Sequence, residues 1–181
     1  QIDPDANGIG FYFDDSAMEN CATTVAPFSP INGYLIATNI DQTSGISGFE
    51  CEVVVSGAPV APAWTLMGSQ PLNIATAPEF MVGFGTGSLA LPYSTAIVMA
   101  TFAAYVMAPT DMIGFSIQPY AISSFNPAAP GYAAGHNAGV LVPLQVATGS
   151  YDTAGAWVNN PDCAVVGNNV VSFGAVKALY R

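Results

Sequence analysis

The first residues of the chain have the types and the spacing of a calcium-binding loop. Asp3, Asp5 and Asn7 follow the D-x-D-x-N-G pattern, in which side-chain oxygens ligate Ca²⁺, and Asp14 stands at its twelfth position. A complete loop must curl so that its first and twelfth residues meet at one ion. Residues 9–13 instead alternate like a strand, which rises about 3.3 Å per residue and carries Asp14 away. The spacing therefore predicts at most a partial calcium site on Asp3, Asp5 and Asn7, and no other cofactor.

The remaining polar residues do not form a catalytic motif. His136 is the single histidine of the sequence, and no nucleophile motif such as G-x-S-x-G accompanies it. Glu50 and Glu52 would lie about 7 Å apart on one strand face, a separation that fits glycosidase carboxylates but also any polar strand face. We interpret both as solubilising charges. Trp64 and Trp157 are candidates for a sugar-stacking platform or for the core. We expect the protein not to be an enzyme.

The three cysteines of the chain predict one disulfide and one remaining thiol. Cys51 has an inward position on a strongly alternating strand, and Cys21 lies upstream in a loop. Pairing these two would close a loop of about 30 residues and stabilise the fold by roughly 3–4 kcal/mol. We expect the Cys21–Cys51 disulfide, with Cys21–Cys163 as the alternative, because Cys21 and Cys163 both lie in loops flanked by Asn or Asp.

Charge is segregated along the sequence. The only two basic residues lie within the last five positions, whereas five of the 12 acidic residues lie within the first nineteen. A formal net charge of -10 excludes nucleic acid and anionic lipid as partners, because nothing neutralises their phosphates. Oppositely charged ends predict contacts between copies of the chain. The residues expected to make these contacts are Asp3, Asp5, Asp14, Asp15, Lys177 and Arg181.

The composition predicts a secreted protein with much covered surface. Charged residues make up 8% of the chain, against about 25% in ordinary soluble domains, and the mean hydropathy is +0.43. Such a surface is expected to be covered by other copies or by O-linked glycan, since no N-x-S/T sequon occurs. The chain starts at Gln1 without Met, as a secreted protein does after signal-peptide cleavage. We expect no membrane insertion, because the apolar run Ala96–Ala108 has 13 residues and a span needs about 20.

Strands are the elements that must position these residues. Alternation with a period of two recurs along the chain, and clusters such as residues 29–33 read as turns. The run Ala96–Ala108 would tolerate a helix, but its Thr and Tyr content favours a strand. Residues 123–139 form the longest irregular stretch. The strands are predicted at residues 9–13, 34–40, 49–55, 64–67, 80–82, 97–107, 112–117, 140–146, 164–171 and 173–180. This pattern predicts an all-β antiparallel sandwich in a single domain, residues 1–181, with residues 1–8 as an acidic N-terminal segment.

Short motifs give the chain a resemblance to known proteins. The runs at residues 10–14, 20–21, 46–51 and 173–181 (GFYFD, NC, ISGFEC and FGAVKALYR) are similar to a group of uncharacterised secreted proteins of environmental bacteria. The middle of the chain also resembles cohesin-like sandwiches. The resemblance implies export and an all-β sandwich of the jelly-roll or cohesin-like type, and it implies no activity.

These observations lead to two functional expectations. The first is a structural subunit of an extracellular filament, tube or surface layer that self-assembles by head-to-tail contacts and by strand addition at a sheet edge. The alternative is a cohesin-like or carbohydrate-binding adhesion module, with its ligand site near residues 123–139 or Trp157.

Overall fold

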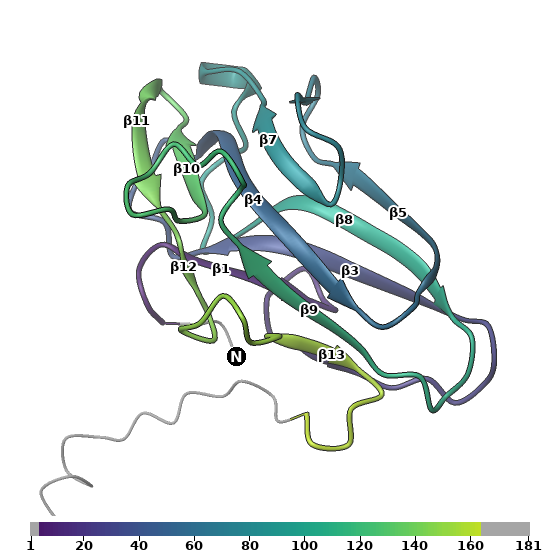
Figure 1. The fold of residues 1–181 in the computed structure, drawn as a ribbon. Helices are drawn as coiled ribbons and strands as arrows, with labels where there is room; N and C mark the ends of the chain where they lie inside the picture. Colours follow the sequence, from purple (N-terminus) through teal and green to yellow (C-terminus); the bar gives the residue numbers. More distant parts are fainter. Residues whose placement is uncertain (1–3, 164–181) are drawn as a thin grey trace, which may run out of the picture.

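The computed structural model describes residues 4–163, and their regular structure is almost entirely β (Figure 1). Two sheets pack face to face, as the alternating sequence pattern predicts. The five-stranded sheet has the order β12 (Gln145–Val146), β1 (Gly8–Tyr12), β3 (Ser29–Thr38), β8 (Ala96–Val106) and β5 (Val60–Leu66).

The larger sheet is built around its longest strand, β4 (Ile46–Ser56). One side of β4 pairs with β7 (Glu79–Gly83), which also pairs with β6 (Leu72–Asn73). The other side pairs first with β10 (Gly131–Ala134) and then with β9 (Ile113–Gln118). The sheet is completed by β11 (Asn137–Pro143) next to β10, and by β13 (Ala156–Val158) and β2 (Cys21–Ala22) beyond β9. A short 3₁₀ turn, η1, spans Gly87–Leu89.

The prediction of a fully antiparallel sandwich needs a correction, because both sheets are mixed. β1 pairs in parallel with β12, and β13 pairs in parallel with β2. Each parallel pair joins two short segments that are far apart in sequence, and the other described strand pairs are antiparallel. In both pairs a strand from the second half of the described chain, β12 or β13, lies beside a strand near its start. A hairpin joins antiparallel strands only and could not supply such a pairing.

One aromatic residue joins the two sheets. The ring of Phe11 on β1 stacks on Phe115 of β9, with centroids 4.0 Å apart, and makes an edge contact with Phe102 of β8. This position is open because β3 has a glycine there: a Cβ on Gly33 would lie 2.1 Å from the Phe11 ring. Gly33 therefore belongs to a strand, and the prediction of a turn at residues 29–33 is wrong.

The strongest strand predictions are confirmed. Phe49, Cys51 and Val53 face the core from β4, and the ambiguous run at residues 96–108 is β8, in the interior of the five-stranded sheet. The strand expected at residues 140–146 is instead two strands, because the buried Leu144 marks the point where the chain passes from one sheet to the other. The stretch 123–139 is not wholly irregular, since it contains β10 and the start of β11. The strands predicted at residues 164–171 and 173–180 lie outside the described residues.

The expected Cys21–Cys51 pairing is wrong, and the alternative Cys21–Cys163 disulfide forms. Cys51 is fully buried in the core between the two sheets. Trp157 of β13 instead pairs with Cys21 of β2, so the loop after β13, which contains Cys163, lies beside Cys21. The bond spans 142 residues of sequence and ties the last described residue to the start of the chain. The sequence pattern placed Cys51 on the correct face of its strand, but that face is out of reach of Cys21.

We predict that the two cysteine types differ sharply on substitution. Cys163→Ala should lower the free energy of unfolding by about 4–5 kcal/mol, because a loop of this length carries a large closure entropy in the unfolded chain. Cys51→Ala removes only a small buried group and should cost about 1–2 kcal/mol. Urea unfolding of the two variants measures both values. Equal losses would contradict the assigned disulfide.

Candidate functional site

The acidic residues at the start of the chain do not gather at one place. Asp5 precedes β1 and is exposed, whereas Asp14, Asp15 and Glu19 follow the end of β1. The strand between them holds the two groups apart by the length of its five residues, about 17 Å. Of the residues predicted to make contacts between copies, Asp3, Lys177 and Arg181 lie outside the described residues.

The proposed calcium ligand Asn7 has a different role in the structure. Its side-chain oxygen accepts hydrogen bonds from the Asp41 backbone N–H (2.9 Å) and the Tyr132 hydroxyl (3.1 Å), and its amide nitrogen donates to Asp41 Oδ2 (2.6 Å). Both lone pairs of the amide oxygen are thus used within the protein. Among residues 4–163, no three His, Cys, Asp or Glu side chains come together as metal ligands. Asn7 therefore ties the start of β1 to the loop after β3.

Asp14 organises the loop that follows β1. Its Oδ1 accepts the backbone N–H groups of Met18 (2.8 Å) and Glu19 (2.7 Å), and its Oδ2 accepts the Ser16 hydroxyl. Burial raises the pKa of this carboxyl, but the hydrogen bonds from Ser16, Glu19 and Met18 together outweigh it and lower the pKa below the ordinary 3.8. The loop places the buried Ala17 over Tyr12 and Ile36, forming a small second core on the outer side of the five-stranded sheet.

Glu50 points away from the main core, as its position in β4 predicts, but it is buried and does not act as a solubilising charge. The loop after β9 folds over it: Oε1 accepts the Ser124 N–H (2.7 Å) and lies 3.0 Å from the Ser123 hydroxyl, and Oε2 accepts the Ser124 hydroxyl (2.6 Å). Its partner in the carboxylate pair, Glu52, is directly opposite Glu79 on β7. Glu50 thus fixes a loop, and its geometry gives no acid–base pair.

The other predicted sites are also dispersed. His136 is exposed, and its Nδ1 lies 2.8 Å from the Ser44 hydroxyl in a contact between two turns. Trp64 packs against Phe80 with centroids 5.2 Å apart and belongs to the edge of the core. Trp157 lies on the other sheet, where its Nε1 donates to Ala154 O. The two tryptophans therefore do not form a shared sugar-binding platform.

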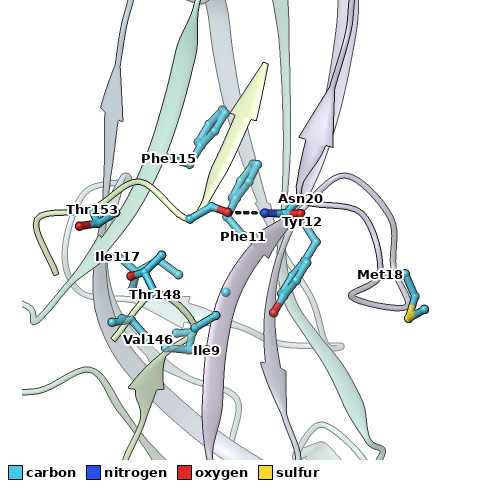
Figure 2. Close-up of a pocket in the computed structure, with 13 residues that line it drawn as sticks. Ile9, Phe11, Tyr12, Met18, Asn20, Phe115, Ile117, Val146, Thr148 and Thr153 are labelled. Carbon is cyan, nitrogen blue, oxygen red and sulfur yellow. Dashed lines mark hydrogen bonds between the residues drawn. The ribbon is translucent and has the colours of Figure 1, made fainter. Parts of the chain in front are cut away.

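A cavity opens at the flank of the sandwich between β1 and β9 (Figure 2). Its walls are mostly apolar, with Ile9, Phe115 and Val146 among them, and Asn20 donates a hydrogen bond to Gly155 O at one side (2.8 Å). The volume is about 30 Å³, room for roughly two water molecules. No carboxylate, histidine or cysteine lines it. The cavity is too small for a sugar ring and has no acid–base residues.

Part of the outer face of the five-stranded sheet is exposed. Here β3, β8 and β5 present three cross-strand rows of side chains, which we call the uncharged face. The rows are Pro30–Tyr105–Val60, Asn32–Ala103–Ala63 and Tyr34–Thr101–Thr65. These side chains are exposed or half-buried, and none carries a charge. By strand geometry, the uncharged face measures roughly 14 by 17 Å.

The absence of charge extends over the whole five-stranded sheet. None of its five strands contains Asp, Glu, Lys, Arg or His. On the inner side this is expected of a core, but on the outer side the part formed by β8 and β5 is open to water. A chain with a formal charge of -10 therefore keeps one broad surface free of charge.

An exposed aromatic side chain lies next to the uncharged face. Phe28 precedes β3, its N–H donates to Met107 O (3.4 Å), and its ring is 60% exposed. Its φ of 55° is in the left-handed region, which costs about 1–2 kcal/mol for a residue with a side chain. The fold thus accepts local strain while leaving a large apolar ring in water. Phe28 and Met107 continue the apolar surface beyond Tyr105.

Sequence reasoning missed the uncharged face, although a signal was present. Asn32, Ala103 and Thr65 are ordinary residues for an outward strand position, so no single position stood out. The signal was collective, because the segments at residues 29–38, 60–66 and 96–106 all lack charge while the two glutamates predicted to face outward lie in another strand.

Comparisons with known proteins found no similar protein. No family model, curated protein or solved structure matches the chain. Within residues 4–163, no helix has the length and apolar character needed to cross a membrane.

We predict that the Asp14 hydrogen bonds stabilise the fold only while the carboxyl is ionised. Because the folded pKa lies below 3.8, this stabilisation is fully present above pH 3.8 and is lost as the pH falls through the folded pKa. Asp14→Ala should cost about 1 kcal/mol at pH 7. The difference from the unmodified chain should shrink near pH 2 in thermal unfolding. Asp15→Ala is the matched control, and an Asp14 effect that did not change with pH would contradict the prediction.

We predict a larger loss when Glu50 is removed. Glu50→Ala leaves the Ser124 N–H and the Ser124 hydroxyl without their acceptor and should cost about 2–3 kcal/mol in urea unfolding. The loop at residues 123–129 should also become sensitive to proteases. Glu52→Ala is the control, because it removes one of two directly opposed like charges and should be neutral or slightly stabilising. Equal losses of unfolding free energy in the two variants would show that the hydrogen bonds between Glu50 and the loop at residues 123–129 do not stabilise the fold.

Proposed function

We propose that the protein is a structural subunit of an extracellular filament, tube or surface layer that assembles from copies of itself. The observation that carries the proposal is the uncharged face: an exposed sheet surface without a charge, in a chain with a formal net charge of -10. Packing this face against another copy covers apolar area without burying an unpaired carboxylate. A monomer would gain nothing from leaving it in water.

Two further observations support self-assembly in an extracellular setting. The Cys21–Cys163 disulfide is of a kind that persists in oxidising compartments. Residues 4–163 contain no Lys or Arg, so a cation that neutralises their carboxylates must come from residues 177 and 181 or from solvent. The charged tail of one copy can therefore meet the acidic surface of the next. We include export by a cleaved signal peptide in this proposal.

A carbohydrate-binding adhesion module is the second candidate. The uncharged face exposes two tyrosine rings, Tyr34 and Tyr105, and flat faces with aromatic rings can stack on sugar rings. Among the remaining side chains of the face, Asn32, Thr65 and Thr101 can donate hydrogen bonds, and the others are Pro, Val or Ala. A neutral aliphatic and tyrosine surface suits a protein partner at least as well, and the excess of uncovered apolar residues elsewhere favours copies of the chain.

We predict that the mature chain forms regular fibres, tubes or sheets in negative-stain electron microscopy. Ala103→Asp places a charge at the centre of the uncharged face without touching the core, and it should abolish or strongly reduce assembly. Ser150→Asp, on an exposed loop elsewhere, should assemble normally. Dispersed single subunits at both low and high salt would contradict the proposed function. Retention of such subunits on cellulose or a glycan array would favour the adhesion module.

The electrostatic part of the proposal has its own variant. Lys177→Glu with Arg181→Glu reverses the two basic charges and should weaken assembly at low salt. High salt should reduce the difference between this variant and the unmodified chain, because exposed charges are screened. Undiminished assembly of this variant at low salt would show that Lys177 and Arg181 do not contribute to assembly. The apolar contact through the uncharged face would then be the remaining explanation.

A further inference from the structure

The free edge of β5 offers backbone hydrogen-bonding groups to another strand. The Met67 N–H donates to Met99 O (3.0 Å), which fixes the phase of the ladder between β5 and β8. In an antiparallel pair the backbone groups of alternate residues point to the same side. The backbone N–H and C=O groups of Ala63 and Thr65 therefore point toward β8, as those of Met67 do. The backbone groups of Trp64 and Leu66 point away from the sheet.

The other sheet edges among residues 4–163 are blunted. On β11 the pairing jumps from Asn137 to Leu141, so three residues bulge out of the ladder. β12 and β2 are only two residues long. β7 is covered by β6 and by the Asn73 side chain, which bonds the Glu79 carbonyl (3.0 Å) and the Met81 N–H (2.9 Å). Bulges, short edge strands and covering segments prevent pairing with another strand. On β5 the pairing is irregular only at the start, where Ala61 has a φ of 50° and Pro62 follows.

The side chains at this edge also leave apolar surface uncovered. Trp64 and Leu66 pack against the core but stay half-exposed at the flank, where Trp64 bridges β5 to Phe80 of β7. Ala63, Thr65 and Met67 point to the outer side and are exposed. The open stretch thus has an apolar inner side and a neutral outer side over residues 63–67. A strand added here would cover the flank of the core.

Residues 173–180 have the pattern that such a strand requires. A period of two puts Gly174, Val176, Ala178 and Tyr180 on one side, which carries no charge. The other side holds Lys177 and Arg181 together with Phe173, Ala175 and Leu179. Beside β5 the inner side faces Trp64 and Leu66, where a charge would be buried. The side without charge must therefore face inward, and Lys177 and Arg181 then lie on the outer, solvated side.

The described chain ends at Cys163, on the opposite flank from β5. Cys163 is tied to Cys21 of β2, and β2 pairs with β13 beneath the β1 side of the sandwich. β5 is at the far edge of the five-stranded sheet, and Figure 1 shows β5 and β13 on different sides of the molecule. A donor segment that leaves the molecule at this flank and adds to β5 of another copy makes a heterologous contact, which propagates from copy to copy.

We propose that residues 173–180 of one copy add to residues 63–67 of β5 in the next copy as a sixth strand of the five-stranded sheet. This inference rests on the proposed function and names the partner and the edge. The uncharged face alone is too small for a stable interface, since about 800 Å² per partner is usual. Strand addition supplies backbone hydrogen bonds that do not depend on charge, and it places Lys177 at the edge of the uncharged face.

Cysteine cross-linking in the full chain tests the pairing. Thr65→Cys, on the outer side of β5, is combined in turn with Ala175→Cys, Lys177→Cys or Leu179→Cys, which lie on the outer side of the added strand. The matched controls combine Thr65→Cys with Val176→Cys or Ala178→Cys, on the inner side. A second control moves the acceptor cysteine to Val140 on β11. Mild oxidation, non-reducing gels and peptide mapping then identify the linked residues.

We expect a ladder of covalent oligomers from at least one outer-side pair, at least tenfold stronger than from any inner-side pair or from the Val140 control. Fibres in the microscope without a ladder through Thr65 would overturn the β5 assignment and leave the proposed function standing. Cross-links found only within single chains would overturn it too, because each chain would then complete its own sheet. Circular dichroism of every variant confirms that the sandwich has folded.

Discussion

The absence of basic side chains from residues 4–163 is the constraint on which the polar architecture depends. Every acidic residue except Asp3 lies in this part of the chain, and none can form an ion pair there with Lys or Arg. Carboxylates are instead held by N–H and O–H donors: Asp14 by the loop after β1, Glu50 by Ser123 and Ser124, and Asp111 by the Ala108 N–H (3.0 Å). These bonds satisfy the oxygens locally but leave the negative charge uncompensated, so the body of the molecule attracts cations from outside.

The same scarcity of charge shapes the apolar surfaces. The five-stranded sheet uses its inner side for the core, where Phe11 crosses Gly33 to reach Phe102 and stacks on Phe115. Its outer side is partly covered at one end, where Ala17 packs on Tyr12 and Ile36. No described segment covers the other end, and there the uncharged face and the open edge of β5 meet. The two uncovered features are therefore one continuous region.

The sequence predicted the fold class because β4 and β8 are long and alternate clearly, and their inward residues needed no tertiary information. It could not predict β10 and β13, since Gly, Ala and three-residue strands carry little periodic signal. The disulfide depended on the parallel pairing of Trp157 with Cys21, a contact between the two ends of the described chain that no local pattern encodes. Burial of Glu50 likewise required a loop that follows it by more than 70 residues. Local patterns thus give strands and faces, whereas edges and loop contacts depend on the assembled sheets.

The number of open edges decides what kind of assembly such a sandwich can form. Among residues 4–163, β5 is the long edge that lacks a bulge or a cover over most of its length, and the proposed donor is a single segment per chain. One acceptor and one donor give each copy a valence of two, which produces linear or ring-shaped chains but no branched network. Sheets and tubes need a further lateral contact, and the outer face beside β5 is free to supply it. Opposite flanks for donor and acceptor then give the chain a direction, because every copy would present the same open β5 edge at the same end.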